Sequence, residues 1–185
     1  MKLGLALEGG ANRTIFSSGV TDGLLDLGIM PDHVTGVSAG LDSGVSYLAR
    51  QRGRNLRILS EYINDDRYMG TSHLIDPLNS SYFNMDFIYD TIPNKLIPFD
   101  YAAFAEYPGV VEAVVTDVDA GTAAYLTVPR EDDQFMALRA TCALPMLFPI
   151  LEVDGIRCMD GGVTDPIPFR HVLDAGCDRV IVVAT

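Results

Sequence analysis

The sequence has 185 residues, of which 48% are hydrophobic and 21% are charged, as is usual for one folded domain. Its net charge of -12 argues against binding nucleic acid through phosphate neutralisation, and any contact with a membrane surface would depend on a local apolar patch. The three cysteines form no paired pattern, and neither a signal peptide nor a run of about 18 apolar residues is present. We therefore expect a single cytoplasmic domain over residues 1–185.

Apolar runs alternate with helical patterns along the chain, and this alternation predicts an α/β fold. The expected strands are residues 2–7, 33–37, 109–117, 123–128, 151–158 and 180–183. The expected helices are residues 14–27, 38–52, 55–63, 131–142 and 169–175. Several strands are uninterrupted apolar runs, so we expect a mostly parallel central sheet covered on both faces, a three-layer α/β/α sandwich.

Two segments fit this alternation less well. Residues 65–106 hold many aromatic side chains and several prolines, which predicts short helices and loops there. The chain also stops directly after its last predicted strand, where a parallel sheet normally continues into a covering helix. This ending is consistent with a fragment of a longer protein, truncated at the C-terminus.

A candidate nucleophile follows the second predicted strand. Residues 36–40 fit the pattern G-x-S-x-G between a strand and a helix, which is the context that the pattern requires. Ser38 would stand on a sharp turn, and Gly36 and Gly40 would leave room for the backbone to pass. The alternative is a chance match on a turn rich in glycine and serine.

A glycine loop follows the first predicted strand, at residues 8–13. Amides at Gly9, Gly10 and Ala11 could converge on an anion, as a phosphate cradle or an oxyanion hole, or the loop could be only a tight turn. Neither phosphate-binding glycine pattern is present, so nucleotide binding is disfavoured.

A serine nucleophile needs a base, and the sequence offers two kinds. The histidines are His33, His73 and His171, and the order Ser38, Asp160, His171 formally fits an α/β-hydrolase triad. We prefer Asp160, which ends a predicted strand just before Gly161 and Gly162 and could accept the Ser38 proton directly. The alternative for Asp160 is a solvated Asp-Gly turn.

Together these motifs resemble the patatin-like phospholipase family, whose pattern is a loop G-G-G-x-R/K-G, then G-x-S-x-G, then D-G-G/A. The matching segments here are residues 9–14, 36–40 and 160–162, in the same order. Residues 139–149, 165–168 and 176–183 look like further family segments, so the resemblance spans nearly the whole chain.

The resemblance implies a patatin-like sandwich and a lipid acyl hydrolase with a Ser38–Asp160 dyad that uses no histidine. It also implies that amides at Gly9, Gly10 and Ala11 receive the oxyanion, with Arg13 supporting the loop. Ala11 replaces the third family glycine, and a positive φ there would cost about 1 kcal/mol. Thr14 replaces the glycine that follows the basic residue.

The expected reaction is acyl transfer to Ser38 followed by hydrolysis, on a lipid or a small ester. We expect no cofactor and no metal, because no cluster of cysteine and histidine is apparent in the sequence. A transient contact with a membrane surface is compatible with such a substrate, and the sequence makes no prediction of oligomeric state. Two rivals remain open: a histidine-assisted esterase of the α/β-hydrolase type, and a catalytically idle lipid-binding module.

Overall fold

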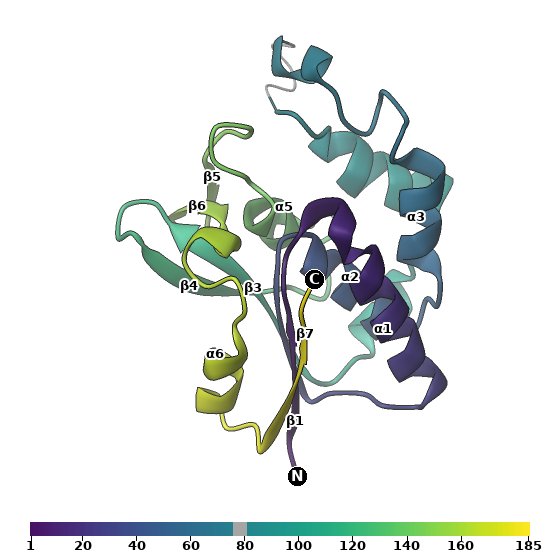
Figure 1. The fold of residues 1–185 in the computed structure, drawn as a ribbon, viewed down its shortest axis with the longest axis vertical. Helices are drawn as coiled ribbons and strands as arrows, with labels where there is room; N and C mark the ends of the chain where they lie inside the picture. Colours follow the sequence, from purple (N-terminus) through teal and green to yellow (C-terminus); the bar gives the residue numbers. More distant parts are fainter. Residues whose placement is uncertain (76–80) are drawn as a thin grey trace.

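A computed structural model of the chain, described for residues 1–75 and 81–185, has a central sheet of seven strands (Figure 1). The strands are β1 Leu3–Leu7, β2 His33–Val37, β3 Val110–Asp117, β4 Thr122–Thr127, β5 Leu151–Val153, β6 Ile156–Asp160 and β7 Arg179–Val183. Their order is β5-β6-β3-β2-β1-β7, and β4 pairs with β3 as well. The predicted α/β class with a central sheet is confirmed.

The sheet has a parallel part and an antiparallel part. Strands β7, β1, β2 and β3 are parallel to one another, whereas β4 and β6 run antiparallel to β3, and β5 runs antiparallel to β6. The parallel strands are the long apolar runs, and in β1 and β2 successive residues, which point to opposite faces, are buried, as at Leu5 and Ala6 and at Val34 and Thr35.

The single strand expected at residues 151–158 is wrong. The chain there forms a hairpin of β5 and β6 around a two-residue turn at Asp154 and Gly155, with φ values of 53° and 78°. Positive φ at both positions is typical of a type I′ turn, which an Asp-Gly pair favours. The hairpin reverses the chain, so that β6 reaches the sheet antiparallel to β3.

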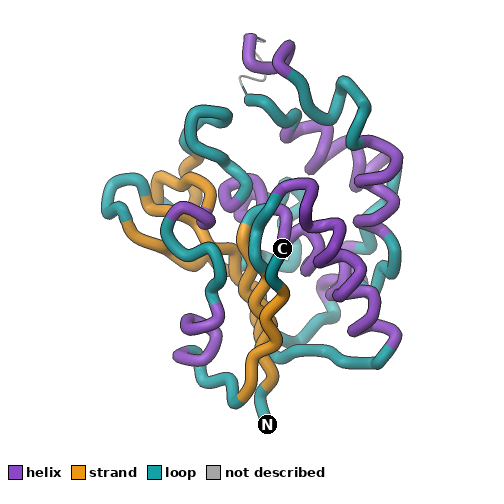
Figure 2. Tube along the Cα trace, viewed as in Figure 1, coloured by secondary structure: helices purple, strands orange, loops and turns teal. Residues whose placement is uncertain are grey.

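Helices cover both faces of the sheet (Figures 1 and 2). The α-helices are α1 Ile15–Asp26, α2 Ala39–Leu48, α3 Arg54–Tyr62, α4 Tyr101–Ala105, α5 Met136–Thr141 and α6 Phe169–Asp174. In Figure 1, α1, α2 and α3 lie to the right of the sheet and α6 lies to its left. Helix α2 packs on β2 and α5 on β3, while α6 packs on β1, β2 and β7, which gives the three layers.

The remaining segments are short. They are the 3₁₀ turns η1 Ala11–Thr14, η2 Thr71–Ile75 and η4 Gly161–Val163 and the π-helical segment η3 Phe87–Leu96. The expectation of short helices and loops over residues 65–106 holds where the structure describes them, and its part on residues 76–80 lies outside the described residues.

The helix expected at residues 131–142 is shorter than predicted, because α5 begins at Met136. The Asp132 carboxylate accepts hydrogen bonds from the amides of Gln134 and Met136 at 2.9 and 2.8 Å. The acidic residues therefore form the turn before the helix instead of its first turn. Among the described residues, no helix combines the length and apolarity needed to cross a bilayer.

Candidate active site

The strand register brings Ser38 and Asp160 to one point at the edge of β3. Strand β2 pairs with β3 up to Val37, opposite Val114, and Ser38 follows it. Because β4 occupies the other edge of β3, β6 must pair on the same edge as β2, and it ends with Asp160 opposite Val115. The two strands therefore approach along one edge from opposite directions, and their ends meet.

Ser38 stands on a tight turn between β2 and α2. Its φ of 51° and ψ of −141° are unusual for a residue with a side chain, and the residue is 9% exposed. A Cβ atom at Gly40 would lie 2.2 Å from the Glu8 carbonyl oxygen, so the glycine lets α2 begin directly against the loop after β1. At Gly36, a Cβ atom would lie 2.9 Å from Leu41 Cα. Both glycines of the motif therefore allow this turn to form.

Thr141, at the end of α5, holds the backbone of the turn. The Ser38 amide donates to Thr141 Oγ1 at 2.9 Å, and the Thr141 hydroxyl donates in turn to the Val114 carbonyl. All three groups are buried. Residues 139–149 resemble the patatin-like family in sequence, but the sequence analysis assigned no role to Thr141. The two partners of Thr141 come from distant parts of the chain, so no local pattern indicates them.

Asp160 is 3% exposed, and its two carboxylate oxygens differ. Oδ1 accepts the Gly162 amide at 2.8 Å, whereas Oδ2 is buried and has no partner of good hydrogen-bond geometry among the described residues. Burial raises the pKa of Asp160, and the Gly162 amide and the nearby Ser38 hydroxyl lower it in part. The Ser38 hydroxyl thus lies beside the carboxylate without being aligned on Oδ2, a looseness common in sites without substrate.

A glycine after Asp160 is needed because the backbones touch. A Cβ atom at Gly161 would lie 2.2 Å from the Val114 carbonyl oxygen. The Asp160 carbonyl accepts the Thr116 hydroxyl at 2.8 Å, and its amide donates to the Ala143 carbonyl at 2.8 Å. The carboxylate is therefore held by backbone and side-chain contacts on several sides.

The glycine loop lies against the serine. A Cβ atom at Gly9 would be 3.0 Å from Ser38 Cβ, and the Gly9 carbonyl accepts the Thr185 hydroxyl at 2.8 Å. Ala11 has the positive φ, 47°, that makes an alanine costly at this position. Thr14 closes the turn by donating its hydroxyl to the Ala11 carbonyl at 2.7 Å.

Three amides of this loop are available. Among residues 1–75 and 81–185, no group accepts a hydrogen bond from the amides of Gly9, Gly10 or Ala11. The Arg13 guanidinium lies against Gly10, since a Cβ atom there would be 3.3 Å from its Nε and Nη2 atoms. Free amides beside a positive charge can stabilise an oxyanion.

A largely apolar cavity opens at Ser38 and encloses about 950 Å³ of empty space, counting its open mouth. Helices α2 and α3 form part of its wall, and the aromatic middle segment supplies much of the rest. The lining from that segment is Tyr68, Phe83, Met85, Ile88, Tyr89, Pro93 and Phe99. A cavity of this character suits an apolar chain whose reacting end lies at the serine.

A carboxylate lies in the cavity wall one helical turn beyond Ser38. The Asp42 carboxylate accepts the Tyr89 hydroxyl at 3.1 and 3.2 Å, and the Cys142 thiol lies 3.9 Å away. Burial raises the pKa of Asp42 to about 7, although the Tyr89 hydrogen bond and the charge of Arg54 lower it. Sequence analysis missed this residue, whose only local signal is its spacing from Ser38.

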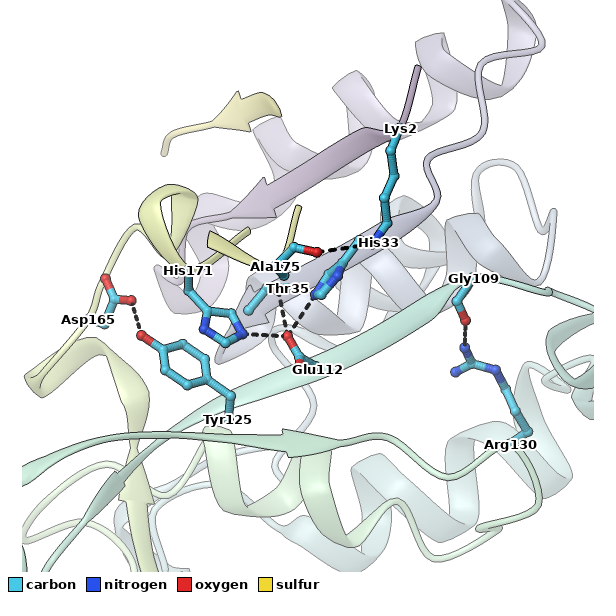
Figure 3. Close-up of polar contacts among 10 residues, drawn as sticks. All are labelled: Lys2, His33, Thr35, Gly109, Glu112, Tyr125, Arg130, Asp165, His171 and Ala175. Carbon is cyan, nitrogen blue, oxygen red and sulfur yellow. Dashed lines mark hydrogen bonds and ion pairs between the residues drawn. The ribbon is translucent and has the colours of Figure 1, made fainter. Parts of the chain in front are cut away.

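The histidines have other partners. His33 and His171 each place Nε2 2.7 Å from Oε2 of Glu112, and His73 Nε2 lies 2.7 Å from the Asp66 carbonyl (Figure 3 shows the first two). His171 also stacks on Tyr125, with ring centroids 3.5 Å apart. The structure therefore places Ser38 beside Asp160 and engages His171 with Glu112 and Tyr125.

A serine on a strand–turn–helix elbow is typical of α/β serine hydrolases. A model of the patatin-like phospholipase family matches residues 5–173, so the chain belongs to this family. Membership supports lipid acyl hydrolysis at the level of the family.

Individual relatives extend beyond this chain. YjjU of Escherichia coli is 25% identical over 201 residues, which cover 100% of this chain and 52% of YjjU. An NTE family protein of Mycobacterium tuberculosis is 28% identical, over 99% of this chain and 49% of its own. The chain thus spans about half the length of these curated relatives. The crystal structure of VipD from Legionella pneumophila is similar in fold, with a TM-score of 0.56 at 13% identity over 89% of this chain and 46% of VipD.

Proposed function

We propose that this chain is a serine-dependent lipid acyl hydrolase in which Ser38 is the nucleophile and Asp160 is the base. The observation that carries the proposal is the meeting of β2 and β6 at Val114 and Val115, which sets the hydroxyl beside a buried carboxylate. Asp160 takes the proton of Ser38 as the serine oxygen attacks the ester carbonyl. The alcohol leaves with that proton, and an acyl-Ser38 remains. Asp160 then takes a proton from the water that attacks the acyl-enzyme; the bond between the carbonyl carbon and Ser38 Oγ breaks, Asp160 returns the proton to Oγ, and the fatty acid is released.

The amides of Gly10 and Ala11 receive the negative oxygen in this proposal. A preorganised donor in such a site contributes about 2.7–4 kcal/mol to the transition state. Gly9 packs against the serine and so sets the distance of the loop, while Arg13 adds positive charge at Gly10. No cofactor takes part in this scheme.

The substrate in this proposal is an ester with an apolar acyl chain, which enters the cavity beyond Ser38. Two exposed apolar side chains lie two positions after cavity residues in the chain: Phe16, 60% exposed, after Thr14, and Met146, 97% exposed, after Leu144. We propose in addition that these two side chains make a transient contact with a lipid surface. Replacing both by serine should weaken sedimentation with neutral phospholipid vesicles, and unchanged sedimentation would remove this part of the proposal.

The test of the nucleophile is loss of ester turnover. Ser38→Ala should abolish hydrolysis of a p-nitrophenyl ester and labelling by a fluorophosphonate probe, while Ser60→Ala, an exposed serine of α3, should retain both. Turnover that persists in Ser38→Ala would refute the mechanism. A wild-type protein that neither reacts with the probe nor turns over ester would favour the idle lipid-binding module.

The test of the base separates Asp160 from a histidine. Asp160→Asn should lower kcat/KM by roughly 10²- to 10⁴-fold, the usual contribution of a general base. Since burial raises the pKa of Asp160, the wild-type activity should fall as the pH drops through that raised value. His171→Ala and His73→Ala should keep the wild-type pH profile. Loss of activity in His171→Ala with retention in Asp160→Asn would favour the histidine-assisted esterase.

A further inference from the structure

A second cluster of reactive side chains lies away from Ser38. His33 is the first residue of β2, Glu112 lies near the start of β3, and His171 comes from α6 on the face opposite α2 (Figures 1 and 3). Ser38 follows the other end of β2, so the cluster lies toward the opposite end of the parallel strands. It therefore stands apart from the proposed dyad.

The cluster converges on one oxygen atom. Oε2 of Glu112 lies 2.7 Å from Nε2 of both histidines, and it accepts the Thr35 hydroxyl at 3.2 Å. One ligand atom from each of the three residues lies within 4.8 Å of the other two. Each residue comes from a different element, so the fold, and not local sequence, assembles the group.

The surroundings orient these side chains. The His33 side chain is 4% exposed, that of Glu112 16% and that of His171 25%. Tyr125 stacks on the His171 ring and donates its hydroxyl to Asp165 at 2.8 Å, which fixes the plane of the imidazole. His33 Nε2 faces a carboxylate oxygen and so carries the ring proton, whereas His33 Nδ1 has no partner among the described residues, which leaves Nδ1 able to take that proton when Nε2 binds an ion.

We propose that His33, Glu112 and His171 bind a divalent transition metal ion of the Zn²⁺ type. Two imidazole nitrogens and one carboxylate oxygen form a donor set that suits zinc, with bonds of about 2.0–2.2 Å. The three ligand atoms already lie within 4.8 Å of one another, and the ion enters by spreading the two histidines from the shared oxygen. Partial exposure of His171 leaves a fourth position for water.

The ion would replace the hydrogen bonds of the cluster by coordination bonds. Each Nε2 must then be unprotonated, so its proton moves to Nδ1 or to solvent. Because the ligands come from β2, β3 and α6, the ion ties this helix to the sheet. The site is structural in this proposal and takes no part in ester hydrolysis.

The wild-type protein is purified with a chelator, which removes bound metal, and the chelator is then removed. The experiment measures the binding of zinc to this protein. Titration calorimetry should give one Zn²⁺ per chain, and excess Zn²⁺ at about one hundred times the Kd should raise Tm by about 5 °C. Co²⁺ in the same site should give the intense visible bands of a four- or five-coordinate ion. The cobalt spectrum should lack thiolate charge-transfer bands, which would indicate cysteine ligands instead.

Matched variants locate the ion. His171→Gln and Glu112→Gln keep hydrogen-bonding side chains of similar size and should lose at least tenfold in zinc affinity and the rise in Tm. His73→Gln removes a histidine outside the cluster and should bind zinc as the wild type does. Circular dichroism checks that each variant is folded, and ester turnover should be the same with and without zinc.

Three results would overturn the proposal. The first is a wild-type protein that gains no thermal stability with Zn²⁺, a result that depends on no variant. The second is equal zinc affinity in folded His171→Gln and in the wild type, and the third is thiolate bands with cobalt. Any of these would leave the cluster as a hydrogen-bonded network that holds α6 to the sheet.

Discussion

Asp42 offers a quantitative test of the electrostatics of the cavity. Its pKa is raised from 3.8 to about 7, chiefly by burial. Between these two pH values the folded protein keeps a proton on Asp42 that the unfolded chain has lost. The contribution of Asp42 to the free energy of unfolding must therefore fall as the pH rises from about 4 to about 7. Asp42→Asn cannot ionise, so this variant should escape that loss while its Oδ1 still accepts the Tyr89 hydroxyl.

The size of the effect follows from the two pKa values. The difference between 3.8 and about 7 corresponds to roughly 4 kcal/mol at pH 8. Asp42 faces the cavity and is only partly buried by surface area, so water that enters the cavity reduces this figure. We expect Asp42→Asn to be about 2–4 kcal/mol more stable than the wild type at pH 8. At pH 4 both folded proteins carry a neutral side chain there, so the difference should be under about 1 kcal/mol.

Urea unfolding at pH 4, 6 and 8, followed by circular dichroism, measures this difference. Asp26→Asn is the matched control, because the hydrogen bond from Arg52 lowers the pKa of that exposed carboxylate. A lowered pKa gives stability above the ordinary pKa that is lost in acid, so the control should show no gain at pH 8. A gain for Asp42→Asn that is equal at pH 4 and pH 8, or a loss at pH 8, would refute the assignment of burial as the cause.

Two further predictions concern the backbone of the proposed site. Gly161→Ala should destabilise the fold by roughly 2–3 kcal/mol, because the new Cβ meets the Val114 carbonyl oxygen at 2.2 Å. Gly19→Ala, where nothing lies within 4 Å, should instead stabilise α1 by about 0.5–1 kcal/mol; equal effects in urea unfolding would contradict the proposed clash. Thr141→Val should leave the Ser38 amide buried without an acceptor, costing about 1–3 kcal/mol of stability. It should also lower kcat more than it raises KM if the turn positions the nucleophile, and unchanged kcat would show that it does not.

Local patterns predicted the elements whose signals are local. The strand at His33–Val37 was predicted with its observed bounds, and the turn at Ser38 lies between a strand and a helix, as the five-residue motif requires. These features depend on hydrophobic period and on glycine, both of which are visible in a short window. The first turn of α5 was misplaced because an acidic residue can cap a preceding turn as well as begin a helix, as Asp132 does.

Long-range contacts escaped the sequence analysis for a physical reason. Thr141 contacts Ser38 across 103 positions, and Glu112 contacts His33 and His171 across 79 and 59 positions. Nothing in the residues around each of these side chains indicates its partner, because the sheet register determines which side chains meet. The sequence weighed the histidines as bases for Ser38 against a surface or packing role, and neither reading anticipated the carboxylate that His33 and His171 share.

The hairpin at Asp154 and Gly155 has the largest consequence for the proposed chemistry. A single strand over residues 151–158 gives Asp160 no defined approach to the elbow. With the turn, β6 runs antiparallel to β3 and ends with Asp160 opposite Val115. Strand β2 ends opposite Val114, the preceding residue of β3. The Asp-Gly pair, by its preference for positive φ, thus sets the direction in which the carboxylate arrives. The position of the proposed base depends as much on this exposed turn as on the glycines that follow Asp160.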